Sequence, residues 1–385
     1  MLDFNFLNPT QILFGKGKIA EIEGEIPAGS RVLITYGGGS VKKNGTLDEV
    51  LAALNGHAVF EFSGIEPNPT YETLMNAVDM VHANSIDFLL AVGGGSVIDG
   101  TKFIAAAAVF EGDPWEILEK HGAGVQKALP FGSVLTLPAT GSEMNNGAVV
   151  TRKSLQAKLA FMSPWVFPRF SVLDPEKTYT LPSRQISNGV VDAFVHIVEQ
   201  YLTYPVNGKV QDRFAEGLLL TLIEEGPKAL KNPKDYEVRS NLMWVATLAL
   251  NGLIGAGVPQ DWATHMIGHE LTAAHGLDHA QTLAVILPNL LTVCKQNKRE
   301  KLLQYAERVW GIVEGESEQR IDAAIDQTRN FFEQMQVKTR LSDYGIGKDS
   351  IPHLLEQLRT HGMISLGEQK DITPELSKRI LESSL

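Results

Sequence analysis

The 385-residue sequence contains a single cysteine, Cys294, and no run of eighteen apolar residues. One cysteine excludes an internal disulfide and any metal site that is rich in thiolates. The lack of a long apolar run excludes a membrane-spanning helix of the usual kind. The first seventeen residues show no basic segment followed by an apolar run, so they do not resemble a signal peptide. We therefore expect a cytoplasmic protein that does not associate with membranes.

Basic side chains are also scarce. The sequence has 34 lysines and arginines against 45 aspartates and glutamates, for a net charge of −11. This balance disfavours nucleic acid and anionic membranes as partners. The remaining composition, 44% hydrophobic and 21% charged, is typical of a globular protein with a large core. The length predicts two domains.

The first 180 residues alternate apolar runs with glycine turns and helical patterns. Four apolar runs predict buried strands, and they begin at Arg31, His57, Asp87 and Ser133. Between them, apolar residues recur every three or four positions, as in amphipathic helices. This alternation predicts a parallel, doubly wound α/β sheet, which binds its ligands at the carboxyl ends of the strands.

The pattern changes after Leu181-Pro182. Strand signals fade, and long helical patterns continue to the end of the chain. We therefore expect an α/β domain over residues 1–180 and an all-helical domain over residues 181–385. No low-complexity linker separates them, so we expect the two domains to pack together and enclose a cleft.

Two predicted strands end in the same tetrapeptide, Gly37-Gly38-Gly39-Ser40 and Gly93-Gly94-Gly95-Ser96. The second follows an apolar strand directly and precedes a helix. Glycines there allow close approach to a diphosphate, and the helix N-terminus offers unpaired N–H groups. Neither copy is the G-x-G-x-x-G fingerprint, and a plain strand-to-helix turn is the alternative. The order of strand, loop and helix favours a phosphate site.

The residues after the first tetrapeptide indicate which dinucleotide is bound. NAD-binding sheets often carry an acidic residue at the end of a strand, where it holds the ribose hydroxyls and repels a 2′-phosphate. Here Ser40, Lys42 and Lys43 offer a hydroxyl and two cations instead. The sequence therefore favours NADP(H), although a solvated pair of surface lysines would look the same.

Four of the ten histidines lie within fifteen residues, at His265, His269, His275 and His279. Asp192 and His196 lie upstream, four residues apart on one face of a predicted helix. Imidazole and carboxylate together suit a first-row divalent metal. Our leading hypothesis is a metal centre built from four of these side chains: Asp192, His196, His265 and His279.

This hypothesis requires a turn between His265 and His279. On one straight helix they would lie roughly 21 Å apart at ~1.5 Å per residue. Gly276 predicts a helix end, and Asp278 a new start. A zinc-protease H-E-x-x-H motif is excluded, because His269 and His275 are six residues apart. Packed core histidines are the alternative, and His275 fits that role best.

Several motifs together resemble the iron-containing (group III) alcohol dehydrogenases, and most closely their NADPH-dependent aldehyde reductase and butanol dehydrogenase branch. They are PTQILFGKG, GGGSVIDGTK, TLPATGSEMN, GVVDAFVHIVEQY and HMIGHELTAAHGLDHA, and they extend almost from end to end. The resemblance implies a dinucleotide-binding α/β domain with a parallel sheet and an all-helical metal-binding domain, an architecture shared with dehydroquinate synthase.

The resemblance also assigns site residues. The family's metal ligands fall on the same four side chains, with iron(II) or zinc as the ion. His269, one turn from His265, would orient substrate or pass a proton. NAD-using members carry an aspartate where this chain has Gly37 or Gly38. The implied cofactor-binding residues are Gly37, Gly38, Gly39, Ser40, Asn68, Gly93, Gly94, Gly95, Ser96, Asp99, Thr136, Thr140, Asn145 and Lys158.

The implied activity is reduction of short- to medium-chain aldehydes to alcohols, in which NADPH supplies a hydride and the ion polarises the carbonyl. Family members form dimers or larger assemblies, so we expect a homodimer. Glycerol dehydrogenase and dehydroquinate synthase activities are alternatives on the same fold. The synthase acts on a polyanion, yet residues 188–200 and 261–282 contain no lysine or arginine. An inactive homologue would be expected to have lost ligands or loop glycines.

Overall fold

The computed structural model describes residues 1–155 and 157–385. Its contacts divide the chain into two compact units. The first, here called the α/β unit, comprises Leu7–Leu181 and Lys234–Thr247. The second, the helical unit, comprises Met1–Phe6, Pro182–Pro233 and Leu248–Leu385. The main transition lies at Leu181-Pro182, where the sequence pattern changes.

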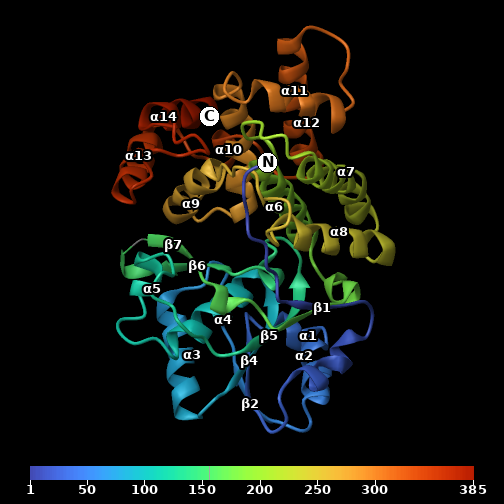
Figure 1. Ribbon diagram of the computed structural model, residues 1–385, viewed down its shortest axis with the longest axis vertical. Helices are drawn as coiled ribbons and strands as arrows, with labels where there is room; N and C mark the ends of the chain where they lie inside the picture. Colours follow the sequence, from blue (N-terminus) through green and yellow to red (C-terminus); the bar gives the residue numbers. More distant parts are fainter. Residues whose placement is uncertain (156) are drawn as a thin grey trace. The chain divides into compact units, whose positions relative to one another are not determined.

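A parallel six-stranded sheet forms the centre of the α/β unit (Figure 1). Its strand order is β1-β8-β5-β4-β2-β3. The four apolar runs in the sequence form β2, β3, β4 and β5, so the predicted parallel sheet is confirmed. Both β1 and β8 are only four residues long. The strands are β1 (Gln11–Phe14), β2 (Arg31–Tyr36), β3 (Ala58–Phe62), β4 (Phe88–Gly94), β5 (Phe131–Leu137) and β8 (Phe170–Leu173).

Successive side chains of a strand point to opposite faces of the sheet. Because the central strands are largely apolar, both faces are apolar, and helices cover both. One face packs against η1 (Lys18–Glu25), α1 (Ser40–Lys43) and α2 (Thr46–Ala53) through Val32, Ile34, Leu90 and Val92. The other face packs against α3 (Tyr71–Ala83) and α4 (Gly95–Ala107) through Leu33, Leu89 and Ala91. Burial on both faces explains why the central strands are continuous apolar runs.

An antiparallel hairpin of β6 (Gly147–Arg152) and β7 (Ala157–Met162) adjoins α4. The unit also receives α8 (Tyr236–Ala249) from the C-terminal half of the chain. Met243 of α8 is fully buried in its core, and Thr247 donates to Glu143 at 2.6 Å. Its short elements are α5 (Glu116–Glu119), η2 (Ser142–Met144), η3 (Lys153–Leu155), η4 (Pro164–Val166) and η5 (Pro175–Thr178).

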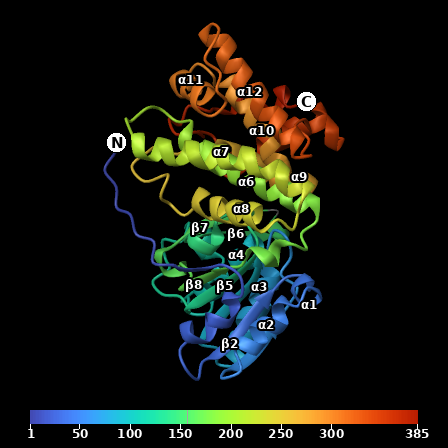
Figure 2. The same ribbon diagram turned by 90° about the vertical axis from the view of Figure 1, so that its right-hand side faces the viewer.

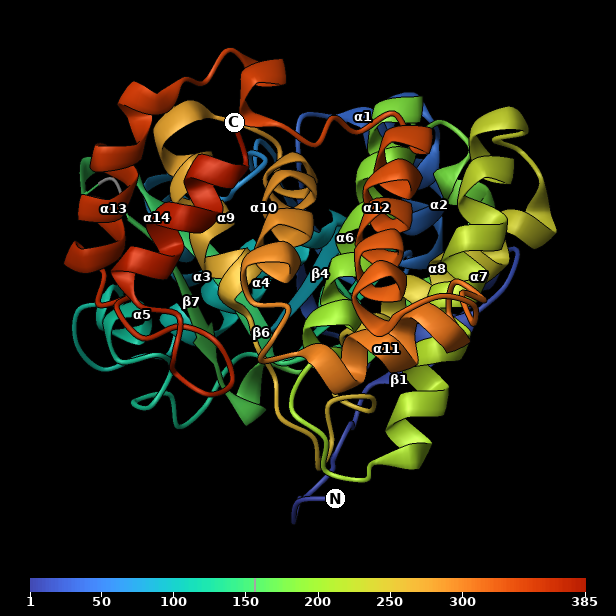
Figure 3. The same ribbon diagram turned by 90° about the horizontal axis from the view of Figure 1, so that it is seen from above.

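The helical unit is organised around α6 (Ser183–Tyr201), which is buried throughout residues 189–201. α7 runs alongside α6 (Figure 2), and α10 packs against α6, α9, α12 and α14 (Figure 3). The remaining elements are α7 (Lys209–Lys231), α9 (Ala263–His275), α10 (His279–Val293), α11 (Arg299–Arg308), α12 (Ser317–Gln334), η6 (Leu341–Tyr344), η7 (Lys348–Ser350), α13 (Ile351–Thr360) and α14 (Pro374–Ser383).

Because α6 is surrounded by other helices, the polar side chains along it must find partners within the protein. These include an aspartate, a histidine and a glutamate in its central turns. Among the described residues, no helix combines the length and the apolar character that crossing a membrane would require.

Candidate metal centre and cofactor loops

Three helices of the helical unit bring the four predicted ligands together. Asp192 and His196 lie on α6, His265 lies on α9, and His279 is the first residue of α10. One ligand atom from each side chain lies within 4.8 Å of the others, and within the described residues this is the one such group of histidine, cysteine and acidic side chains. Three of the four residues are at most 5% exposed.

The turn between His265 and His279 is confirmed. α9 ends at His275, and the next residue, Gly276, has a left-handed backbone (φ 70°) that suits glycine. Gly276 donates its N–H to the Thr272 carbonyl. Asp278 then begins α10 with a capping box. Arg184 and Asn188 of α6 donate to the Asp278 carboxylate at 2.5–2.7 Å. α6 therefore fixes the start of α10 and with it the position of His279.

Electrostatics in this cluster favour a neutral imidazole at His196. Burial, together with the neighbouring His265, holds the pKa of His196 well below its usual value. The two rings stack with their centroids 4.6 Å apart. Asp192 Oδ1 lies 3.5 Å from His196 Nδ1 and 3.6 Å from His279 Nε2. Neutral imidazoles beside a carboxylate form a donor set that fits iron(II) or zinc.

His269 adjoins this cluster without belonging to it. Its ring centroid lies 5.3 Å from that of His279 and 6.3 Å from that of His265, and the residue is half-buried. His275 is exposed at the end of α9 and contacts the Ser350 hydroxyl at 2.6 Å. Because His275 is exposed, it is not the packed core histidine that the sequence suggested, and it lies outside the four-residue cluster.

Neighbouring strands bring the predicted cofactor segments to one edge of the sheet. The two GGGS loops follow β2 and β4, which pair with each other, and β5 pairs with the other side of β4. The chain runs from β2 outward to β3 and then returns to β4 on the opposite side of β2. The two loops therefore flank the point where the strand order reverses, which is where such sheets bind ligands.

Close packing makes glycine necessary in the second loop. A Cβ atom on Gly93 would lie 2.6 Å from the Val97 side chain, and one on Gly95 would lie 2.4 Å from Thr140 Oγ1. A Cβ atom on Gly94 would lie 2.9 Å from the Cβ atom of Leu137. These glycines keep the loop compact above α4, whose N-terminus begins at Gly95.

Further predicted cofactor residues contact one another near this edge. Asn68, with a left-handed backbone (φ 56°), accepts from Lys158 at 2.9 Å and donates its backbone N–H to Ser96. Asp99 accepts from the Ser142 hydroxyl at 2.6 Å and from Val149 N–H at 3.0 Å. Thr136 lies at the end of β5, and Asn145 donates to Thr140.

Comparisons with known proteins match this arrangement. Residues 9–175 match the family model for iron-containing alcohol dehydrogenase. Residues 186–384 match that for the C-terminal part of the Fe-containing alcohol dehydrogenase family. The chain belongs to the iron-containing alcohol dehydrogenase family. The family predicted from the sequence motifs is thus confirmed.

Full-length relatives carry related functions. The chain is 66% identical to the NADPH-dependent aldehyde reductase YqhD of Escherichia coli K12, with both chains covered completely. It is 40% identical to the probable NADH-dependent butanol dehydrogenase 1 of Bacillus subtilis, again over both full lengths. The predicted branch of the family, which contains both kinds of enzyme, is therefore also confirmed.

Solved structures of family members share the fold. A crystal structure of Escherichia coli YqhD has a TM-score of 0.99 and 65% identity, and the match covers 100% of this chain and 99% of that one. The NADH-dependent butanol dehydrogenase A of Thermotoga maritima has a TM-score of 0.95 at 34% identity, with the same coverage. The predicted combination of a parallel α/β sheet and a helical C-terminal region is confirmed.

In this alcohol dehydrogenase family member, two contacts near the site were not predicted from the sequence. The first is Glu199, whose Oε2 lies within hydrogen-bond distance of His265 Nδ1. Glu199 lies three residues after His196, on the same side of α6, and this spacing could have indicated it. The second is Glu61 of β3, which pairs with Lys42 at 3.0 Å. Both predicted cationic partners of a 2′-phosphate, Lys42 and Lys43, are exposed, and Lys42 is already paired with Glu61.

A fully buried lysine supports the cofactor edge of the α/β unit. Lys102 of α4 donates to Asn145 Oδ1 at 2.7 Å and to the Gly147 carbonyl at 2.8 Å. Burial lowers the pKa of Lys102 to about 8, although the nearby charges of Asp99 and Glu143 oppose the shift. Lys102 thus holds the segment that carries Asn145.

This lowered pKa predicts a pH dependence of stability. Below pH 8, Lys102 is charged in the folded protein, and the cost of burying this charge lowers the free energy of unfolding. As the pH rises from about 8 to 10.5, the unfolded chain binds more protons at this site than the folded chain, so this contribution to the free energy of unfolding increases. The difference in free energy of unfolding between wild type and Lys102→Met should grow by about 3 kcal/mol over that interval in urea denaturation. Parallel pH profiles would contradict the assignment.

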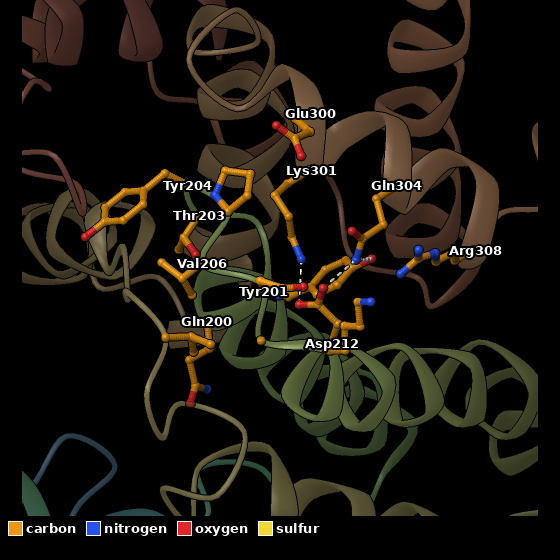
Figure 4. Close-up of a pocket in the computed structure, with 15 residues that line it drawn as sticks. Gln200, Tyr201, Thr203, Tyr204, Val206, Asp212, Glu300, Lys301, Gln304 and Arg308 are labelled. Carbon is orange, nitrogen blue, oxygen red and sulfur yellow. Dashed lines mark hydrogen bonds and ion pairs between the residues drawn. The ribbon is translucent and has the colours of Figure 1, made fainter. Parts of the chain in front are cut away.

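A separate pocket in the helical unit has a volume of about 210 Å³ (Figure 4). Lys301 binds Asp212 at 2.7 Å and lies 4.0 Å from the centre of the Tyr201 ring. Arg308 donates to Glu216 at 3.1 Å. Both cations are thus paired with carboxylates, and the pocket lining in the described chain includes none of the four clustered ligands.

Proposed function

We propose that this protein reduces short- to medium-chain aldehydes to alcohols with NADPH, using one divalent ion, iron(II) or zinc. The observation that carries this proposal is the cluster of Asp192, His196, His265 and His279, with ligand atoms within 4.8 Å in a family of alcohol dehydrogenases. The activity named for the 66% identical Escherichia coli relative supports the substrate class and the cofactor. We also propose that the enzyme works in the cytoplasm, in keeping with its single cysteine.

Separate groups of residues would bind the hydride donor and activate the aldehyde. An ion bound at the cluster would act as a Lewis acid toward the carbonyl oxygen of the aldehyde. The Gly93–Ser96 loop would bind the pyrophosphate at the start of α4, and Thr136, Thr140 and Asn145 would position the nicotinamide end. The chain therefore carries residues for binding the hydride donor and residues for activating its acceptor.

His269 would orient the substrate or transfer a proton. It lies beside two of the four ligands and is only half-buried, so a small molecule can reach it. Its imidazole can donate or accept a proton near neutral pH. In this role His269→Ala would retain metal and slow turnover.

Cofactor preference would depend on the residues after β2. We expect the double variant Ser40→Ala/Lys43→Ala to lower the ratio of kcat/KM for NADPH over NADH by about 10- to 100-fold, because hydrogen bonds to a charged phosphate are lost. The matched control is Lys42→Ala, which should have a smaller effect because Lys42 is paired with Glu61. An unchanged ratio in the double variant would show that the 2′-phosphate is recognised elsewhere.

Association into a homodimer is the second part of the proposal. The first six residues expose four large apolar side chains, Met1, Leu2, Phe4 and Phe6, each 45–50% exposed. Val210 and Phe214 of α7 are similarly exposed. Exposed apolar side chains of this size are often covered by another chain. Light scattering should show a dimer in wild type and a shift toward monomer in Phe4→Asp.

The first test of the enzymatic proposal is NADPH oxidation with a short aliphatic aldehyde. One preparation is divided into untreated, chelator-stripped, and stripped samples resupplied with iron(II) or zinc. Loss of activity on stripping and its recovery with metal would support a metal-dependent reductase. Bound metal without turnover would contradict it and favour the dehydroquinate synthase-like alternative.

A further inference from the structure

A buried carboxylate lies directly behind one of the four clustered histidines. Glu199 Oε1 of α6 accepts from the Thr264 backbone N–H at 2.6 Å, and Glu199 Oε2 lies within hydrogen-bond distance of His265 Nδ1. Its side chain is 2% exposed. Both partners lie in the first turn of α9, so this one carboxylate joins α6 to the beginning of α9.

This contact determines how the His265 ring can be used. When Nδ1 carries the proton that Glu199 accepts, a metal ion at the cluster would be bound through Nε2. A second partner of this kind fixes the tautomer and orientation of a ligand histidine and raises its basicity. The glutamate is therefore placed to control one of the four ligands without touching the ion.

A second buried contact holds the same helix ends together. Lys298, whose side chain is 4% exposed, donates to the Leu202 carbonyl at the end of α6 at 2.7 Å. It also pairs with Asp261, just before α9, and with Glu368, both at 2.9 Å. Asp261 in turn donates its backbone N–H to the Glu199 carbonyl. These contacts fix the backbone around Glu199 and make it a rigid support.

We propose that Glu199 is a positioning residue for the metal centre, which fixes His265 with Nδ1 protonated and Nε2 toward the ion. The inference rests on the proposed function, since it assumes that the cluster binds a metal. A purely structural glutamate would contribute to folding without altering metal affinity. In Glu199→Gln, the amide can accept only one of the two hydrogen bonds, because its NH2 group faces the other N–H donor.

The test is a Co²⁺ titration of metal-stripped protein, followed by visible absorption and by competition with a chelator. Glu199→Gln should bind Co²⁺ about 10- to 100-fold more weakly than wild type, with altered Co²⁺ absorption bands. Circular dichroism should show the same helix content. NADPH affinity should not change, since the predicted cofactor residues lie in the α/β unit.

Glu216→Gln is the matched control. Glu216 is also a buried glutamate of the helical unit, but its partners are Arg213, Tyr201, Gln304 and Arg308. This variant should keep wild-type Co²⁺ affinity and absorption. If Glu199→Gln also binds Co²⁺ like wild type, the inference is overturned while the proposed function stands. A wild-type protein that binds no Co²⁺ contradicts both.

A measurement on wild type covers the case in which Glu199→Gln does not fold. In ¹⁵N-histidine-labelled, zinc-loaded protein, the ring resonances of His265 can be assigned through correlations to its own backbone. We expect a protonated Nδ1 and a metal-bound Nε2. Zinc bound at Nδ1 of His265 would overturn the inference.

Discussion

Replacing Asp192 with alanine should lower kcat/KM for aldehyde reduction by about 10³-fold or more and release the metal. Asp192 Oδ1 lies 3.5 Å from His196 Nδ1 and 3.6 Å from His279 Nε2, and Asp192 is the one carboxylate among the four clustered side chains. Electrophilic stabilisation of a developing alkoxide is worth several kcal/mol, and its loss produces an effect of this size. The measurements are NADPH oxidation with butyraldehyde and metal content by mass spectrometry. His265→Ala should behave in the same way.

His275→Ala is the control for this prediction. It removes an imidazole from the same helix, but one that is exposed and contacts Ser350. It should therefore keep wild-type metal content and turnover. A metal-free Asp192→Ala or His265→Ala protein that turned over at the wild-type rate would rule out the proposed mechanism.

The second large effect is expected at the phosphate loop. In Gly95→Ala, the new Cβ would lie 2.4 Å from Thr140 Oγ1, so the loop or the threonine must move. Overpacking of this kind costs about 1–3 kcal/mol. If this free-energy cost weakens NADPH binding, the Kd for NADPH should rise by up to about 100-fold. Fluorescence titration with NADPH measures it directly.

Gly24→Ala provides the control within the same unit. A Cβ there meets nothing within 4 Å, and the backbone needs no positive φ. This variant should bind NADPH with unchanged affinity. Wild-type affinity in Gly95→Ala would show that the loop can yield without disturbing the dinucleotide, and it would weaken the assignment of a phosphate site.

Sequence patterns predicted the central sheet well because its strands are buried on both faces. The apolar runs of β2, β4 and β5 end in glycine or threonine turns that lie close together, as parallel pairing requires. The edge strand β1 and its neighbour β8 were not predicted, because four residues are too few to establish a periodicity. Likewise, α8 reads as one more amphipathic helix, and nothing in it indicates that it packs with the sheet.

In the candidate site, arrangements of residues close in sequence could be predicted, and some contacts between residues far apart in sequence could not. Helical spacing placed Asp192 beside His196, and Gly276 predicted the turn that returns His279 to them. Glu199 could not be assigned a partner, because His265 lies 66 residues away and the pairing depends on how α6 meets α9. The pairing of Lys42 with Glu61 similarly depends on the adjacency of β2 and β3.

The position of α8 in the sequence has a consequence for folding during synthesis, because α8 is made long after the strands of the unit that it completes. The chain passes between the two units four times, and the α/β unit is completed only by Lys234–Thr247. As synthesis proceeds from the N-terminus, the sheet must wait for Met243 to fill its core and for Arg239 to bind Thr178. During that interval we expect the nascent chain to expose the apolar surface that Met243 covers in the folded protein. We therefore expect nascent chains that end between Leu181 and Pro233 to bind chaperones more strongly than chains extended beyond Thr247.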